Sequence, residues 1–130
     1  MSSKTFFSIE FDFHASPQLL YQYLSTPSGL SEWFADNVNS RGENFEFIWD
    51  DGEEHAKLIN SKNNERIRFQ WINGEEDEAD CNFEFKIEVD EITKDVSLIV
   101  SDFSEEDELE ESKLLWENLI SDLKQVLGSA

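Results

Sequence analysis

Residues 104–128 of the chain read SEEDELEESKLLWENLISDLKQVLG. Apolar residues recur there mostly three, four or seven positions apart, the spacing that lines side chains along one side of an α-helix. The segment therefore predicts one long amphipathic helix over about residues 105–127, with Ser104 as its N-terminal cap and Gly128 after its end. The apolar stripe needs an equally apolar partner surface. Its members are Leu109, Trp116, Leu119, Ile120, Leu123 and Leu127.

Most of the preceding chain alternates apolar and polar residues, which is the period of a half-buried β-strand. Two short helices are predicted after the first strand, because Ser16-Pro17 and Thr26-Pro27 are typical helix starts. The sequence thus predicts an α+β fold, in which a curved antiparallel sheet of six strands packs against the long C-terminal helix. The predicted strands are residues 7–13, 45–49, 56–59, 67–71, 83–89 and 96–100.

Length and charge limit the classes of protein to consider. The 130 residues fit one domain covering residues 1–130. The chain has 30 acidic and 10 basic residues, which gives a net charge of −20. This charge argues against nucleic acid or an anionic membrane as a partner. It also opposes self-association, and therefore favours a monomer or weak dimer. A lone cysteine, Cys81, together with the lack of a leader-like or membrane-spanning apolar run, predicts a cytoplasmic location.

Several local patterns, spread over nearly the whole chain, resemble one family. They are FHASPQLLYQYL at residues 13–24, Trp33-Phe34, the glycines Gly42 and Gly52, ERIRFQW at residues 65–71, and Trp116 in the last helix. In these patterns the chain resembles START-like (SRPBCC) proteins of the heat-shock-chaperone ATPase activator homologue type (AHSA-type). The resemblance implies the helix-grip fold, also called Bet v-like. The shared motifs are packing motifs, so they indicate a fold better than an activity.

The resemblance also implies an apolar ligand cavity between the sheet and the long helix. Large rings leave irregular gaps, and tryptophan N–H groups can orient a polar ligand atom. The alternative is that the same rings simply fill the core. Leu115 and Arg41 stand where such proteins often have glycine, which implies a narrower or more filled pocket. The expected lining is Trp33, Phe34, Trp49, Phe69, Trp71, Phe83, Phe85 and Trp116.

The sequence predicts no catalytic residue, metal ligand or cofactor. His14 and His55 lack a metal-binding spacing and are expected at the surface. The acidic residues before Cys81 disfavour a reactive thiolate there. The acidic cluster is expected to be a solvated loop, because it lacks the EF-hand pattern of a calcium site. The alternative is that it binds calcium or a basic partner. That cluster is Glu75, Glu76, Asp77, Glu78 and Asp80.

Three functions are therefore open. The leading prediction is a non-enzymatic domain that binds a small hydrophobic ligand between the sheet and the C-terminal helix. The second is a protein-interaction module, such as a co-chaperone-like regulator, that binds a basic protein partner through its acidic surface. The third is an enzyme of the cyclase, dehydratase or hydrolase kind, for which no catalytic residues are visible and for which fold analogy alone is no support.

Overall fold

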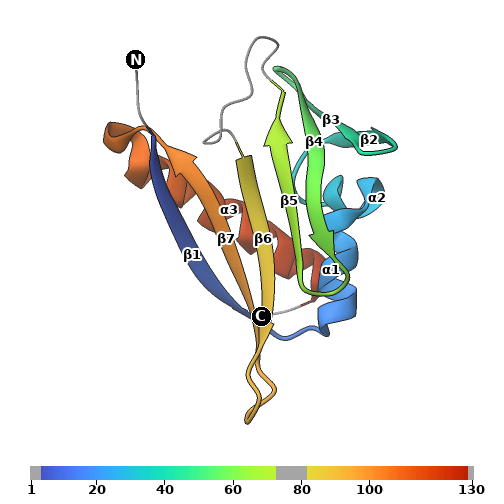
Figure 1. Ribbon diagram of the computed structural model, residues 1–130, viewed down its shortest axis with the longest axis vertical. Helices are drawn as coiled ribbons and strands as arrows, with labels where there is room; N and C mark the ends of the chain where they lie inside the picture. Colours follow the sequence, from blue (N-terminus) through green and yellow to red (C-terminus); the bar gives the residue numbers. More distant parts are fainter. Residues whose placement is uncertain (1–3, 73–81, 129–130) are drawn as a thin grey trace.

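The computed structural model describes residues 4–72 and 82–128. Its strands form one antiparallel sheet in the order β1-β7-β6-β5-β4-β3-β2, so that β1 and β2 are the two edges (Figure 1). The strands are β1 (Thr5–Phe13), β2 (Asn37–Arg41), β3 (Asn44–Trp49), β4 (Gly52–Lys62), β5 (Arg66–Trp71), β6 (Asn82–Val89) and β7 (Val96–Ser104). The helices are α1 (Pro17–Ser25), α2 (Pro27–Leu30), the 3-10 turn η1 (Glu106–Glu108) and α3 (Leu109–Leu127).

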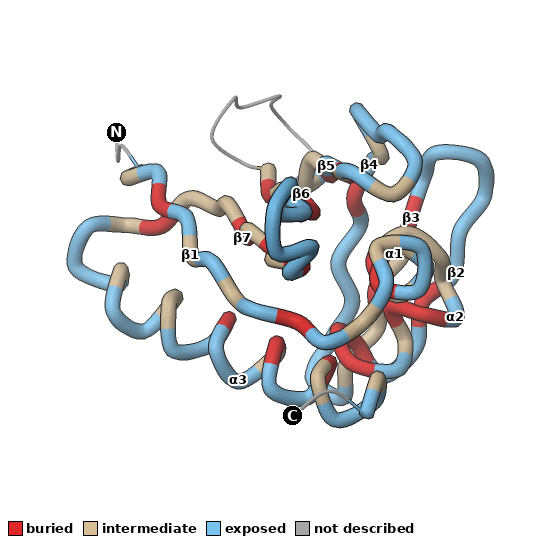
Figure 2. The backbone as a smooth tube through the Cα atoms, turned by 90° about the horizontal axis from the view of Figure 1, so that it is seen from below, coloured by how far each residue is buried: buried red, intermediate tan, exposed pale blue. Residues whose placement is uncertain are grey.

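The sheet curves around α3, and the core lies between them. In Figure 2 the buried stretches of α3 face the strands, while the opposite side of the helix is exposed. Trp116, Ile120 and Leu123 are the buried residues of α3, which confirms the predicted apolar stripe. The inner face of the sheet supplies the partner surface through buried residues such as Phe69 and Phe85. The α+β helix-grip architecture is therefore confirmed.

Within residues 4–72 and 82–128 the sheet has seven strands, so the prediction of six was wrong by one. The missed strand, β2, has the sequence NVNSR and pairs only with β3. Val38 is its single buried residue. An edge strand with one inward apolar side chain gives no alternation that a sequence pattern could detect.

The two short helices begin where the sequence predicts. The Ser16 Oγ accepts a hydrogen bond from the Leu19 N–H at 3.1 Å, and the Thr26 Oγ1 accepts one from the Gly29 N–H at 3.0 Å. Leu20 is fully buried in α1. Gly29 is buried in α2, where an added Cβ would lie 2.4 Å from the Gln22 carbonyl oxygen of α1. The absence of a side chain at Gly29 therefore allows α2 to pack directly on α1.

The start of the long helix differs from the prediction, whereas its end agrees. Ser104 does not cap α3, because it is the last residue of β7 and pairs with Thr5 across the β1–β7 ladder. Its Oγ instead accepts a hydrogen bond from the Ser112 Oγ at 2.9 Å. The helix begins at Leu109 and ends at Leu127, and it is followed by Gly128, whose φ of 72° is the left-handed conformation typical of a glycine at a helix C-terminus.

Other predictions concern the surface. His14 and His55 are both exposed, as predicted. The acidic cluster of residues 75–80 and Cys81 lie outside the described residues. Among the helices of residues 4–72 and 82–128, none combines the length and the apolar character needed to cross a membrane.

Candidate ligand site between sheet and helix

All eight predicted lining residues belong to one cluster of touching aromatic rings. Trp116 of α3 stacks on Phe34 with ring centroids 6.0 Å apart, and meets Phe85 edge to face at 5.7 Å. Trp71 packs against Phe83 at 5.0 Å. Six of the eight are buried, and two are only partly buried, namely Trp49 and Trp71. The structure thus brings the eight side chains together, while their role in binding a ligand stays a prediction.

The centre of this cluster is filled by its own rings. Phe34 alone contacts Phe47 at 5.1 Å and Phe83 at 5.6 Å. Phe47 is fully buried and also touches Trp71, although it was not among the predicted lining residues. The alternation of β3 could have identified it. Leu115 and Arg41, the two residues that stand where such proteins often have glycine, are both exposed.

Three of the four tryptophans use their indole N–H inside the protein. Trp33 donates to the Tyr23 carbonyl oxygen at 2.8 Å, and Trp49 donates to the Phe34 carbonyl oxygen at 3.1 Å. The Trp116 Nε1–H donates to the Asp102 carboxylate at 2.9 Å. These three N–H groups therefore already have acceptors within the protein.

A hollow of about 400 Å³ opens beside the cluster, between the segment that follows α2, the end of β3 and the middle of α3. Its volume lies within the range of small-molecule sites. It reaches three of the predicted residues, contains three carboxylates and has no lysine or arginine in its lining. The lining residues are Ser31, Glu32, Trp33, Phe34, Ala35, Asp36, Trp49, Leu119 and Asp122.

Asp102 is a polar residue on the inner face of the sheet that the sequence analysis missed. It follows the buried residues Leu98 and Val100 at the next inward position of β7. Its Oδ2 accepts the Trp116 N–H, and its Oδ1 accepts the backbone N–H of Phe103 at 2.7 Å. Burial raises the pKa of Asp102, against the opposing effect of these two hydrogen bonds and of the Lys4 charge. A carboxylate at a position where the strand pattern calls for an apolar residue was the available signal.

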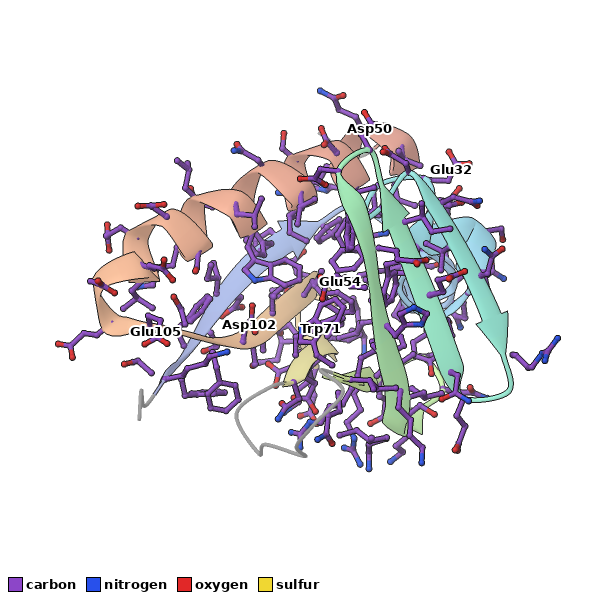
Figure 3. All side chains as sticks on the ribbon, turned by 90° about the horizontal axis from the view of Figure 1, so that it is seen from above. Glu32, Asp50, Glu54, Trp71, Asp102 and Glu105 are labelled. Atoms are coloured by element: carbon purple, nitrogen blue, oxygen red, sulfur yellow. The ribbon has the colours of Figure 1, made fainter. Side chains whose placement is uncertain are left out.

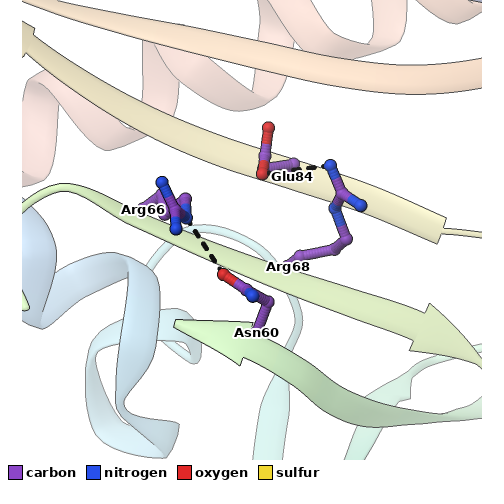
Figure 4. A network of polar contacts seen from close by, with 4 residues as sticks. All are labelled: Asn60, Arg66, Arg68 and Glu84. Carbon is purple, nitrogen blue, oxygen red and sulfur yellow. Dashed lines mark hydrogen bonds and ion pairs between the residues drawn. The ribbon is translucent and has the colours of Figure 1, made fainter. Parts of the chain in front are cut away.

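Polar groups on the outer face of the sheet form separate clusters. Glu46, Glu53 and His55 bring their ligand atoms within 4.8 Å of one another, and a hydrogen bond shared with Glu46 raises the pKa of Glu53. This group was missed because its members come from facing strands. Farther along the same face, Arg68 pairs with Glu84 at 3.2 Å and Arg66 donates to Asn60 (Figure 4).

Comparison with known proteins identifies one family and several similar solved structures. The family model of the START-like superfamily domain matches residues 1–129. No curated protein matches the chain. The solution structure of BfR322 from Bacteroides fragilis is 32% identical, covers 98% of this chain and 93% of that chain, and has a TM-score of 0.68.

Two more distant structures share the fold. The Aha1 dimer from Colwellia psychrerythraea has a TM-score of 0.79 at 18% identity, covering 95% of this chain and 96% of that chain. Protein MLL2253 from Mesorhizobium loti has a TM-score of 0.76 at 16% identity, covering 95% of this chain and 97% of that chain. The helix-grip topology and the aromatic cluster under α3 agree with the family match over residues 1–129, and the chain belongs to the START-like superfamily.

Proposed function

We propose that this protein is a non-enzymatic domain that binds a small apolar ligand in the hollow beside α3. The observation that carries the proposal is the contact between this hollow of about 400 Å³ and the aromatic cluster, through Trp33, Phe34 and Trp49. A concave site of this size that is lined by aromatic rings and a few polar groups is typical of small-molecule binding. The START-like fold supports the same class of function.

The packing of the cluster indicates where the ligand lies. Its central rings are buried in contact with one another, so they leave the ligand no room in the middle. Trp49 and Leu119 are only partly buried, and both line the hollow. The ligand therefore lies against the rim of the cluster, along the side of α3 that carries Leu119.

A binding experiment on two leucines of α3 tests this position. Leu119 lines the hollow, whereas Leu115 is 58% exposed on the same helix and does not. Titration of 1-octanol, followed by NMR of the indole N–H signals, is expected to give a saturable shift at Trp49 in the wild type. Leu119→Gln is expected to weaken this binding, because it removes apolar contact area, and Leu115→Gln is expected to leave it unchanged.

Two results would count against the proposed function. One is a wild-type protein whose tryptophan signals show no saturable response to 1-octanol. The other is equal binding by the wild type and Leu119→Gln, which would place the ligand elsewhere. Native mass spectrometry of protein purified from its own host gives an independent readout, since a natural ligand bound in the hollow would add a fixed mass.

A further inference from the structure

We propose that the outer face of the sheet binds the phosphate group of a small soluble molecule, through a cationic cluster formed by Arg66, Arg68 and Lys86. A hollow of about 280 Å³ lies over this cluster, which comes from the neighbouring strands β5 and β6. The cluster is on the opposite face of the sheet from α3, so the inference goes beyond the proposed function and does not depend on it. The lining residues of this outer hollow are Asn60, Arg66, Arg68, Glu84 and Lys86.

Basic residues are scarce in this chain, yet five of the ten lie together on this face. They occupy outward positions of β4, β5 and β6, which are neighbours in the sheet. Figure 3 shows that the carboxylates of Glu54 and Asp102 lie on the other side, between α3 and the β3–β4 hairpin. In a protein with a net charge of −20 the outer face is therefore a local reversal of charge. The five residues are Lys57, Lys62, Arg66, Arg68 and Lys86.

The strand register places like charges directly opposite one another. Arg66 pairs with Lys62 of β4 on one side and with Lys86 of β6 on the other. Like charges at directly opposed positions of antiparallel strands repel each other and lower stability. An anion bound over this row would replace the repulsion between its members by attraction to the anion.

Arg66 makes no ion pair within the described part of the chain. Its Nε donates a hydrogen bond to the neutral side-chain oxygen of Asn60 at 3.0 Å (Figure 4), and none of the four ion pairs there includes it. Arg66 is only partly buried and lines the outer hollow. The bond to Asn60 thus orients the guanidinium, while its two terminal nitrogens have no acceptor among the described residues.

The other two cations of the cluster have partners but can still bind a ligand. One terminal nitrogen of Arg68 donates to Glu84 at 3.2 Å, and the planar fork of an arginine has further N–H groups. Lys86 lies 3.3 Å from Glu88, and both side chains are about half exposed. Because exposed ion pairs contribute little to stability, Lys86 can turn toward a ligand at little cost.

The charge and shape of the cluster favour phosphate over carboxylate. Glu84 offsets one of the three positive charges that line the hollow. The two that remain match a phosphate monoester, which carries about two negative charges at neutral pH and offers three strong acceptor oxygens. A carboxylate has one charge and two oxygens, so it cannot bind all three cations equally well. A phosphate-bearing membrane is disfavoured as the source, since the net charge of −20 opposes approach to an anionic surface.

Three probes separate the anionic group from the rest of a ligand. Phenyl phosphate and benzoate share a ring and differ in the anion, whereas inorganic phosphate has no ring. Each probe is titrated at physiological ionic strength and a pH of about 7.5, where a phosphate monoester is mostly dianionic, in a buffer without phosphate. Binding is followed by NMR of the backbone amide signals of Arg66, Arg68 and Lys86.

Arg66→Gln is compared with Arg41→Gln as the matched control. Both substitutions remove one positive charge, but Arg41 is exposed on the edge strand β2, three strands away from β5. That separation of about 14 Å exceeds the screening length of about 8 Å. Lys86→Gln is a second variant of the cluster, on the neighbouring strand. Circular dichroism shows whether each variant is folded.

The wild type is expected to give saturable shifts of the three amide signals with phenyl phosphate, and to bind it at least about tenfold more tightly than benzoate. Arg66→Gln is expected to weaken the binding of phenyl phosphate by about tenfold or more, because a charge-assisted hydrogen bond is lost. Lys86→Gln should weaken it as well. Arg41→Gln should change it by less than about twofold.

The outcomes also identify the source of the phosphate. Tighter binding of phenyl phosphate than of inorganic phosphate supports an organic monoester, and equal or tighter binding of inorganic phosphate supports the free ion. The phosphate site is refuted if no phosphate probe shifts the three signals saturably, if benzoate binds as tightly as phenyl phosphate, or if Arg66→Gln and Arg41→Gln bind phenyl phosphate equally well. None of these results bears on the hollow beside α3, which the titration of 1-octanol tests separately.

Discussion

Replacing Trp116 with Phe tests the carboxylate–indole contact that joins α3 to β7. Trp116 and Trp33 form a matched pair, since each is 5% exposed and each donates its N–H to a protein oxygen. The acceptor is a carboxylate for Trp116 and a neutral backbone carbonyl for Trp33. Loss of a hydrogen bond to a charged group and of part of the buried ring should together lower the free energy of unfolding of Trp116→Phe by about 3 kcal/mol at neutral pH.

The pH dependence separates the two variants. The Trp116 hydrogen bond lowers the pKa of Asp102, so its removal raises the folded-state pKa of this acid further. The destabilisation of Trp116→Phe is therefore largest above the folded-state pKa of Asp102. This destabilisation becomes smaller as the pH falls and Asp102 is protonated. At acidic pH only the loss of ring packing and of a hydrogen bond to a neutral acceptor contributes to it. The destabilisation of Trp33→Phe should not depend on pH, because its acceptor does not titrate.

Urea unfolding followed by circular dichroism, at a series of pH values, measures both variants against the wild type. The reasoning is refuted if the destabilisation of Trp116→Phe is the same at neutral and at acidic pH. It is also refuted if the two variants show the same pH dependence. Either result would mean that the ionised form of Asp102 does not accept the Trp116 N–H in solution.

Three further substitutions test other parts of the structure. Burial raises the folded-state pKa of Asp102 above its ordinary value of 3.8, so the wild type loses stability as the pH rises from 3.8 to the folded-state pKa. At neutral pH the free energy of unfolding of Asp102→Asn should therefore exceed that of the wild type by about 1.4 kcal/mol for each unit by which the pKa is raised. Urea unfolding at acidic pH should show that this difference vanishes. Gly29→Ala should destabilise by about 2 kcal/mol or more, because the new Cβ meets the α1 backbone, whereas Ser28→Ala in the same helix should stay within about 0.5 kcal/mol in thermal unfolding. Phe83→Ala, at a site that is 1% exposed, should lower the free energy of unfolding by about 3–5 kcal/mol in the same urea assay, and a smaller loss would mean that the surrounding rings close the gap.

The sequence was sufficient to predict the architecture, because residues buried on one side of a helix or strand recur at a regular spacing. The alternation in β5 and β6 and the stripe around Trp116 each report which side of an element faces the core, and together they require a sheet packed on a helix. The edge strand β2 left no such trace, since Val38 is its only buried residue. Ser104 was misassigned because the same residue type suits a helix cap and the end of a strand, and only the pairing with Thr5 distinguishes the two.

The candidate site was only partly predictable for a different reason. The eight rings could be named because aromatic residues on inward positions must meet in the core. The hollow could not, because it depends on which residues of distant elements become neighbours. Asp102 could be recognised as a carboxylate at an inward position of β7, but its contact with Trp116 depends on the same tertiary packing. The contact between Asp102 and Trp116 joins positions from a strand and a helix, and the hollow joins the segment after α2, the end of β3 and α3. Periodicity within one element carries no information about such contacts.

The position of β1 at the end of the sheet has a consequence for behaviour at high concentration. A nine-residue edge strand offers unpaired backbone groups to any second extended chain. Glu10 and Asp12 are exposed on this strand, so two copies that approached edge to edge would bring carboxylates together. Salt screens this repulsion, so we expect a higher ionic strength to favour contact between the edges of two copies.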